Sequence, residues 1–343
     1  MAGMDIFKNS AFSMTSLTGT VDRMQYVPQM LGQLNLFDPM PVRTRALFID
    51  RRQGALKLIP SSPLGAPPEE LINDDRDAVP LKTTRLTKGF TLYAHEIEGY
   101  RQHGSETELM QVQAEYLRRM QRVREDMDLT HEYHRLGALQ GLLLDADGTT
   151  VIYNYFTEFG VAQPAVIDFE LDVDTTNVRQ KFVDLARSMV RGSGGALTPT
   201  TQIHALVGDA FYDAVINHPT VQRTYLNWAA AADLRGNAGG VGAAFSDFTY
   251  GGVTLHNYRG TDDNSTVAIA PDQAKFFPVG ARDVFKKAMA PAEFGPYINT
   301  PGLDTYAINI VDRDRAAFTR GELYSYPLYF CQRPDLLRTG IRA

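Results

Sequence analysis

The sequence of 343 residues lacks the features of several protein classes. Its one cysteine, Cys331, cannot form an intrachain disulfide or a metal site made of thiols alone, and we expect it to be a small buried residue. No apolar run is long enough to span a bilayer, and no signal-peptide pattern opens the chain, so we expect no membrane segment and a cytoplasmic location. The formal net charge is −6 and no large block of lysine and arginine occurs, which argues against tight sequence-independent binding of nucleic acid.

The first part of the chain has too few contiguous apolar residues to form a core of its own. From Met1 to Asp38, isolated apolar side chains such as Phe7 and Phe12 are scattered among Ser, Thr, Asn and Gln. We expect this segment to be an arm that packs on another surface.

A projecting loop is predicted after the arm. Strand-like runs occur in RALFIDRR (45–52), in ALKLIP (55–60) and in a third run that begins at Pro80, PLKTTRLTKGFTL. The connector 60–80 contains five prolines and a cluster of acidic residues, which disfavours regular structure. Strands on either side of such a connector are expected to form a hairpin with a stiff, polar tip.

The strongest helix pattern follows this loop. Ser105 and Glu108 form a potential capping box, and apolar residues then recur every three or four positions to Met127 on an otherwise polar segment. The helix is predicted to run to about Leu136, and it would have roughly 35 residues and a length near 50 Å if it continued to Leu139. So long an amphipathic helix is expected to be a spine of the fold.

Two short acidic motifs resemble parts of a phosphatase site. Asp145 and Asp147 in GLLLDADGTTV match the nucleophile and the general acid and base of haloacid-dehalogenase-type phosphotransferases, and Asp209 with Asp213 matches their magnesium-binding element. The context favours a structural interpretation. Asp147-Gly148 is a preferred two-residue hairpin pair, the alternating TTVIYNYFTEF predicts an antiparallel return strand, and Asp209 is a candidate N-cap. The phosphatase stays an alternative hypothesis.

One further cluster could in principle bind a metal ion. His131, Glu132 and His134 follow Asp128 by about one helical turn, which places carboxylate and imidazole groups on neighbouring turns. No second helix supplies a matching set. We therefore favour a solvated or subunit-facing helix surface over a metal site.

Several segments together resemble a known family. They are RALFIDRRQGALKLIPSSPLGAPP, EIEGYRQHGSETELMQVQAEYLRRM, LLLDADGTTVIYNYFTEFG, FYDAVINHPTVQRTY and ELYSYPLYFCQRPDLL. In this order, over nearly the whole chain, they are similar to the phage major capsid protein E family, a lambda-type branch of capsid proteins with the Hong Kong 97-type fold. The resemblance implies an α+β fold and a structural role in a tailed-phage head, without catalytic residues, cofactors or metal ions. A non-viral protein compartment of the same fold is a further alternative.

The resemblance also implies a domain layout and partners. The expected parts are an N-terminal arm (1–41), an extended loop (42–92), a peripheral domain with the spine helix (93–190), an axial domain (191–301) and a C-terminal return to the peripheral domain (302–343). The expected partners are further copies in hexamers and pentamers, a scaffolding protein, a portal, possibly a decoration protein, and packaged DNA as a non-specific neighbour. The expected location is the virion capsid, assembled in the host cytoplasm.

The assembly surfaces can be assigned to specific segments as a hypothesis. Apolar residues of the arm and loop, including Leu47 and Ile49, are expected to be buried on neighbouring subunits. A charged strand edge and an acidic tip are expected to set the register between subunits. The candidate interface residues are Phe7, Phe12, Arg43, Arg45, Phe48, Arg51, Arg52, Leu56, Leu58, Glu69, Glu70, Asp74, Asp75 and Asp77.

Overall fold

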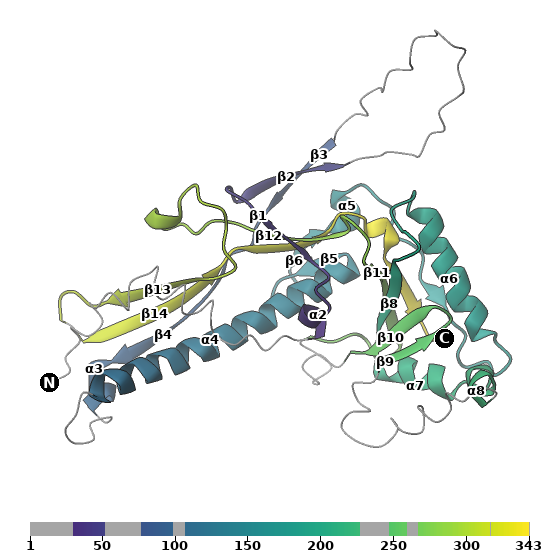
Figure 1. The fold of residues 1–343 in the computed structure, drawn as a ribbon, viewed down its shortest axis with the longest axis horizontal. Coiled ribbons are helices and arrows are strands. Elements are labelled where there is room, and N and C mark those ends of the chain that lie inside the picture. Colours follow the sequence, from purple (N-terminus) through teal and green to yellow (C-terminus); the bar gives the residue numbers. More distant parts are fainter. Residues whose placement is uncertain are drawn as a thin grey trace, which may run out of the picture.

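The computed structural model describes residues 30–51, 77–98, 107–226, 247–258, 267–315 and 317–342. Figure 1 shows a long helix with a sheet along it at one end of the molecule, a second sheet with its own helices at the other end, and a two-stranded hairpin that projects between them. The fold is mixed α and β. No helix in these ranges is both long and apolar enough to cross a membrane.

The long helix is α4 (Thr107–Gln140), which confirms the predicted spine. Its 34 residues give a length of about 51 Å at about 1.5 Å per residue. The apolar stripe of α4 is buried from Tyr116 to Met127 against the sheet β13 (Tyr306–Val311), β14 (Phe318–Ser325) and β4 (Leu86–Tyr93). The predicted cap residue Ser105 lies outside the described residues.

The expected single strand that begins at Pro80 is instead two strands in two sheets. β2 (Ala46–Arg51) pairs antiparallel with β3 (Asp77–Lys82) to form the hairpin, whereas β4 pairs with β14. The chain turns between them because the backbone N–H of Thr83 donates to Arg45 O at 3.0 Å and that of Thr84 donates to Pro327 O at 3.0 Å. These bonds end the hairpin and direct the chain toward the spine.

A three-stranded sheet lies at the centre of the molecule. β12 (Phe285–Met289) is its middle strand, parallel to β1 (Asp38–Pro41) and antiparallel to β15 (Pro327–Cys331). Cys331 is buried there as expected, and its burial raises the pKa of the thiol. Short elements next to this sheet are α2 (Met30–Gln33), β5 (Leu142–Leu144), β6 (Val151–Asn154), α5 (Tyr155–Glu158) and η4 (Gly295–Tyr297). Helix α3 (Ala94–Glu98) follows β4 and lies at the end of the spine helix that is far from this sheet (Figure 1).

The second sheet, which we call the axial sheet, has six strands in the order β7-β16-β11-β8-β10-β9. Three helices accompany it, and α6 and α7 pack in one core around contacting rings of Phe169, Phe182, Phe211 and Phe276. The bounds are β7 (Ile167–Asp168), β8 (Gln202–Val207), β9 (Asp247–Tyr250), β10 (Val253–Asn257), β11 (Gln273–Val279), β16 (Arg338–Ile341), α6 (Val178–Gly192), α7 (Asp209–Asn217) and α8 (Pro219–Leu226).

The path of the chain differs from the expected layout at two places. Within 302–343, β13 and β14 pack along the spine helix and β15 joins the central sheet, whereas the last strand, β16, pairs with β11 and β7 in the axial sheet. Helix α6 starts in the stretch expected to be peripheral, yet its apolar face is buried in the axial core. Both differences arise from pairing and packing between segments that are far apart in the sequence.

Candidate assembly surfaces

The hairpin of β2 and β3 has one face turned into the molecule and one turned out. Leu47 and Ile49 are about 95 % buried and pack in the same core as Val79 and Leu81. Phe48, which points the opposite way because side chains alternate along a strand, is 73 % exposed. The expectation that Leu47 and Ile49 are buried on a neighbouring subunit is therefore wrong, since their own subunit covers them.

The base of the hairpin is fixed to the body by specific hydrogen bonds. The Tyr153 hydroxyl of β6 accepts from the backbone N–H of Lys82 at 2.8 Å and lies 3.2 Å from Lys82 O, to which it donates. Arg45 also belongs to this base, because its guanidinium lies 3.5 Å from Glu293 and 5.1 Å from the centre of the Tyr326 ring. Arg43 is exposed. The direction in which Phe48 projects is thus set by the body of the subunit.

Most of the other predicted interface residues lie outside the described part of the chain. For Arg51 and Asp77 the structure describes the backbone, at the outer ends of β2 and β3, but not the side chains. The residues outside are Phe7, Phe12, Arg52, Leu56, Leu58, Glu69, Glu70, Asp74 and Asp75.

The last part of the predicted arm packs on its own subunit. Leu31 in α2 is 1 % exposed, and its backbone N–H donates to Glu132 Oε1 on α4 at 2.8 Å. Glu132 is also about 99 % buried and lies 3.1 Å from the Arg135 guanidinium, yet burial outweighs these partners and raises the pKa of its carboxyl group. This carboxylate therefore anchors the end of the arm to the spine helix.

The polar cluster around Glu132 is buried, which corrects the expected solvated or subunit-facing surface. His131 and His134 are at most 2 % exposed, and burial lowers the pKa of His134 to about 4 and that of His131 well below its usual value. His131 Nδ1 lies 3.1 Å from the Tyr329 hydroxyl of β15. Within the described ranges, no group of three or more His, Cys, Asp and Glu side chains is arranged to hold a metal ion.

A partly buried ion pair continues this cluster toward β12. Lys287 donates to Asp304, and burial lowers the pKa of Lys287 while the lysine holds the pKa of Asp304 at about 2 despite partial burial. On α4, Arg124 lies 3.5 Å from Asp128. The Arg135 guanidinium of α4 lies 5.2 Å from the centre of the Tyr329 ring on β15, so a charged side chain also joins the spine helix to the central sheet.

The acidic phosphatase-like motif is a turn, as its sequence context suggested. β5 and β6 pair antiparallel, and Asp145 O accepts from the backbone N–H of Gly148 at 2.9 Å, so that Ala146 and Asp147 occupy the centre of the turn. The turn is therefore one residue earlier than predicted, with Gly148 in the left-handed region (φ 70°).

Asp147 is committed to stabilising this turn. Its carboxylate accepts from the backbone N–H groups of Thr149 and Thr150 at 3.0 and 2.8 Å, and these bonds, with the Thr150 hydroxyl, lower its pKa. The expected return strand is shorter than predicted, because the side chain of Asn154 caps α5 and ends β6.

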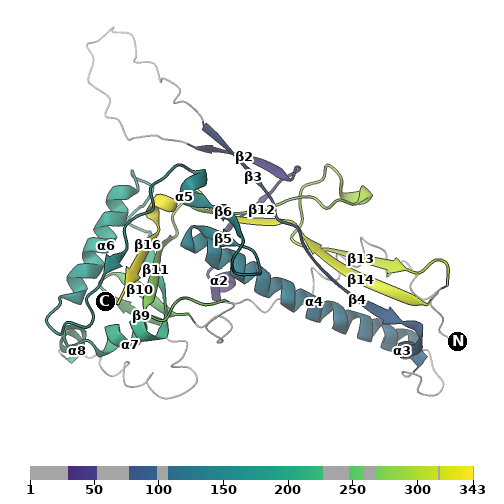
Figure 2. The same cartoon turned by 180° about the vertical axis from the view of Figure 1, so that it is seen from behind.

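The second phosphatase-like motif lies in a different part of the fold. Asp209 is the first residue of α7 and Gly208 is the N-cap, so the predicted capping role of Asp209 is wrong. Figures 1 and 2 place α7 beside the axial sheet and the β5–β6 turn near the end of the spine helix. The two motifs do not form one site, and the phosphatase hypothesis is not favoured.

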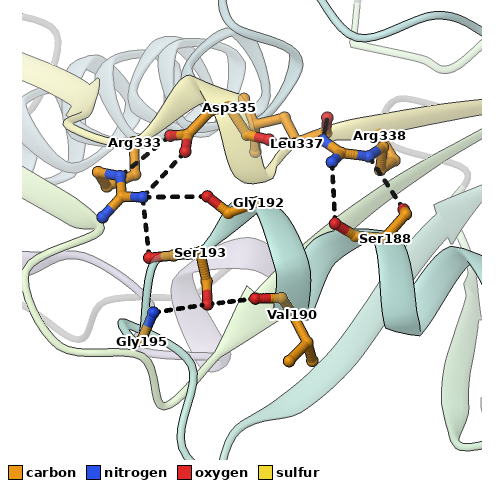
Figure 3. A network of polar contacts seen from close by, with 9 residues as sticks. All are labelled: Ser188, Val190, Gly192, Ser193, Gly195, Arg333, Asp335, Leu337 and Arg338. Carbon is orange, nitrogen blue, oxygen red and sulfur yellow. Dashed lines mark hydrogen bonds and ion pairs between the residues drawn. The ribbon is translucent and has the colours of Figure 1, made fainter. Parts of the chain in front are cut away.

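A polar clasp that sequence reasoning missed connects the C-terminal segment to α6 (Figure 3). The Arg333 guanidinium lies 3.0 and 2.9 Å from the two oxygens of Asp335 in η5 (Pro334–Leu336) and donates to Ser193 O at 3.0 Å. Arg338 donates to the Ser188 hydroxyl at 3.3 Å. A cation at a helix C-terminus binds unpaired carbonyl groups and favours the helix dipole, so the clasp holds α6 in place.

Comparisons with known proteins agree with this architecture. The phage major capsid protein E family matches residues 13–342. The chain is 25 % identical to the major capsid protein of Salmonella phage Felix O1 over 96 % of both chains, and 26 % identical to that of Pseudomonas phage KPP10 over 88 % of this chain and 89 % of the relative. A crystal structure of a putative capsid protein from an Escherichia coli CFT073 prophage has a similar fold, with a TM-score of 0.58 and 12 % sequence identity. The similarity covers 96 % of this chain and 99 % of that chain.

Proposed function

The chain belongs to the phage major capsid protein E family and has its Hong Kong 97-type fold, and we propose that copies of it join through the projecting hairpin to form the hexamers and pentamers of an icosahedral phage head. Its role is structural. In such a shell each copy makes several weak contacts at once, and the closed assembly is stable because the contacts act together.

The exposed position of Phe48 carries this proposal. Phe48 is 73 % exposed on the outer face of a hairpin whose opposite face is buried, so this large apolar side chain is available for contact with another copy. Covering it on a neighbouring subunit would remove apolar area from water at about 25 cal/mol per Å². Arg43 lies beside the same hairpin and is exposed, so it is available to orient the contact.

The proposed assembly includes further partners. We infer that a separate scaffolding protein and a portal take part in the assembly of the head, that a decoration protein is an optional addition, and that packaged DNA is a non-specific neighbour of the inner surface. The net charge of −6 is consistent with a shell that encloses DNA without gripping it. The location is the virion, with assembly in the host cytoplasm.

Sedimentation of the expressed chain, with electron microscopy of the fastest fraction, tests the proposal. We expect closed shells, rings or tubes, and we expect Phe48→Asp to reduce these species while the subunit keeps its folded spectrum. Leu47→Ala is the matched control, because it truncates a buried neighbour on the same strand and should cost about 2–5 kcal/mol of subunit stability. A wild-type chain that stays a compact monomer or dimer, alone and with a scaffold, would overturn the proposal.

A further inference from the structure

Helix α6 has two apolar faces, of which one is buried and the other is partly exposed, with Ala186 also packed against the axial core. The first is buried in the axial core and comprises Val178, Phe182, Leu185 and Met189. The second comprises Val183, Ala186 and Val190, which follow one another at intervals of three and four residues and so lie on one side of the helix. Val190 is 56 % exposed. A helix of a globular protein normally needs only the buried stripe.

The second face forms one wall of an open groove. Its three apolar residues line the groove together with Arg187, Arg191 and Gly251 of the β9–β10 turn, around a volume of about 400 Å³. The lining is apolar apart from the two arginines, of which Arg187 also lies 3.3 Å from the carboxylate of Asp184 on the same helix. We call this surface the α6 groove.

The position of the α6 groove is well defined in the subunit. The polar clasp of Figure 3 holds the C-terminal end of α6, and the side chain of Val190 in that view points away from Arg333 and Asp335. At the other side of the groove, Gly251 is in close contact with α6, since a Cβ atom there would lie 2.8 Å from Phe182 Cβ. The groove is therefore a rigid surface, which lowers the entropic cost of binding to it.

The charge of the groove limits what can occupy it. Two copies packed through the same groove would bring four arginines together, which is unfavourable. The chain contains one segment of complementary character, EELINDD (69–75), with four acidic residues, no basic residue and an apolar pair, Leu71 and Ile72. We call it the acidic segment.

The acidic segment is also attached in a suitable place. It belongs to residues 52–76, which connect the outer ends of β2 and β3 and lie outside the described ranges. Leu71 and Ile72 precede Asp77, the first residue of β3, by six and five residues, so they can lie at most about 20 Å from the outer end of that strand. The acidic segment is therefore carried close to the projecting hairpin through which copies are proposed to join.

We propose that the α6 groove binds the acidic segment of a neighbouring copy in the shell. Leu71 and Ile72 fill the apolar part of the groove, and the flanking carboxylates pair with Arg187 and Arg191. This contact rests on the proposed shell function and adds a second, electrostatically selected contact to the one at Phe48. It also gives the acidic residues of the loop a defined partner.

Exchange of charge between the two surfaces tests the proposal. The groove variant carries Arg187→Glu and Arg191→Glu, and the segment variant carries Glu70→Lys and Asp74→Lys. Because each variant places like charges across the contact, we expect each alone to assemble at least about tenfold less than the wild type in sedimentation. An equimolar mixture of the two should recover assembly, since groove and segment are then complementary between different copies. Arg282→Glu with Arg313→Glu is the control for an equal change of net charge at exposed positions.

The outcomes separate this inference from the proposed function. Wild-type shells together with groove variants that assemble normally would overturn the inference and leave the function intact. Rescue only when all four substitutions are in one chain, and not in the mixture, would show that the segment docks on its own subunit and would also overturn it. If the wild type itself does not assemble, both proposals fail. Circular dichroism of each variant shows whether the subunit is folded.

Discussion

The carboxylate of Glu132 provides a quantitative test of how the arm is held to the spine helix. The group is about 99 % buried, accepts from Leu31 N at 2.8 Å and lies 3.1 Å from Arg135. Glu132→Ala leaves the buried N–H of Leu31 without its acceptor and the guanidinium of Arg135 without its carboxylate. This loss should lower the free energy of unfolding by about 3–5 kcal/mol. Because burial raises the pKa of Glu132, its charge is unfavourable in the folded state. Glu132→Gln keeps an acceptor without the charge and should cost no more than about 1 kcal/mol.

Chemical unfolding of the unassembled subunits measures these differences. Glu125→Gln is the control on an exposed side of the same helix, and it should stay within about 0.5 kcal/mol of the wild type. Because the pKa of Glu132 is raised in the folded state, the folded wild type binds a proton first as the pH falls, so the wild type should gain stability toward that pKa while Glu132→Gln should not. The stability of the wild type relative to Glu132→Gln should therefore increase as the pH falls. Equal destabilisation by Gln and Ala would refute the reasoning, because the charge and not the acceptor would then hold the arm. An alanine variant as stable as the wild type would show that the bond to Leu31 contributes nothing.

Two other predictions concern the axial sheet and the β5–β6 hairpin. Burial, together with His256, lowers the folded-state pKa of His204 from 6.5 to about 4. The unfolded state therefore binds the extra proton first, and the free energy of unfolding should fall by at most about 3 kcal/mol as the pH drops from 6.5 to 4. His204→Asn should flatten this pH dependence of stability, and an unchanged slope would contradict the prediction. Gly141→Ala should cost about 2–4 kcal/mol, because Gly141 has φ 78° and an added Cβ would lie 2.4 Å from Phe156 Cε2. Gly148→Ala, at φ 70° with open space around it, should cost only about 1 kcal/mol, and similar losses for the two variants would argue against the steric contact.

The parts of the fold that were predicted correctly are governed by local sequence. The repeated apolar positions of α4 could be recognised because residues three and four apart share one side of a helix. The presence of a turn near Asp147 and Gly148 could be recognised because those residue types favour a tight turn in any context, although its centre lies one residue earlier than predicted. Strand alternation predicts that one face of the hairpin is buried. It does not predict that the same subunit covers that face, as the structure shows.

The wrong predictions concern residues whose surroundings come from distant segments. The sequence around His131 and Glu132 is polar enough for a solvated helix face, but Tyr329 and Leu31, 198 and 101 residues away, close over it. The break between β3 and β4 depends on acceptors at Arg45 and Pro327, which no local pattern indicates. The α6 groove likewise requires the β9–β10 turn beside the helix.

The sequence alone therefore determined the secondary structure of the strongly patterned segments and, through its resemblance over most of the chain, the family and its structural role. The tertiary structure decided which surfaces are buried within one subunit and which stay exposed. Arg333 reaches α6 across 140 residues of chain, and β16 joins the axial sheet at the C-terminal end. Burial depends on all the segments that meet at a place, and their meeting is a property of the folded chain as a whole.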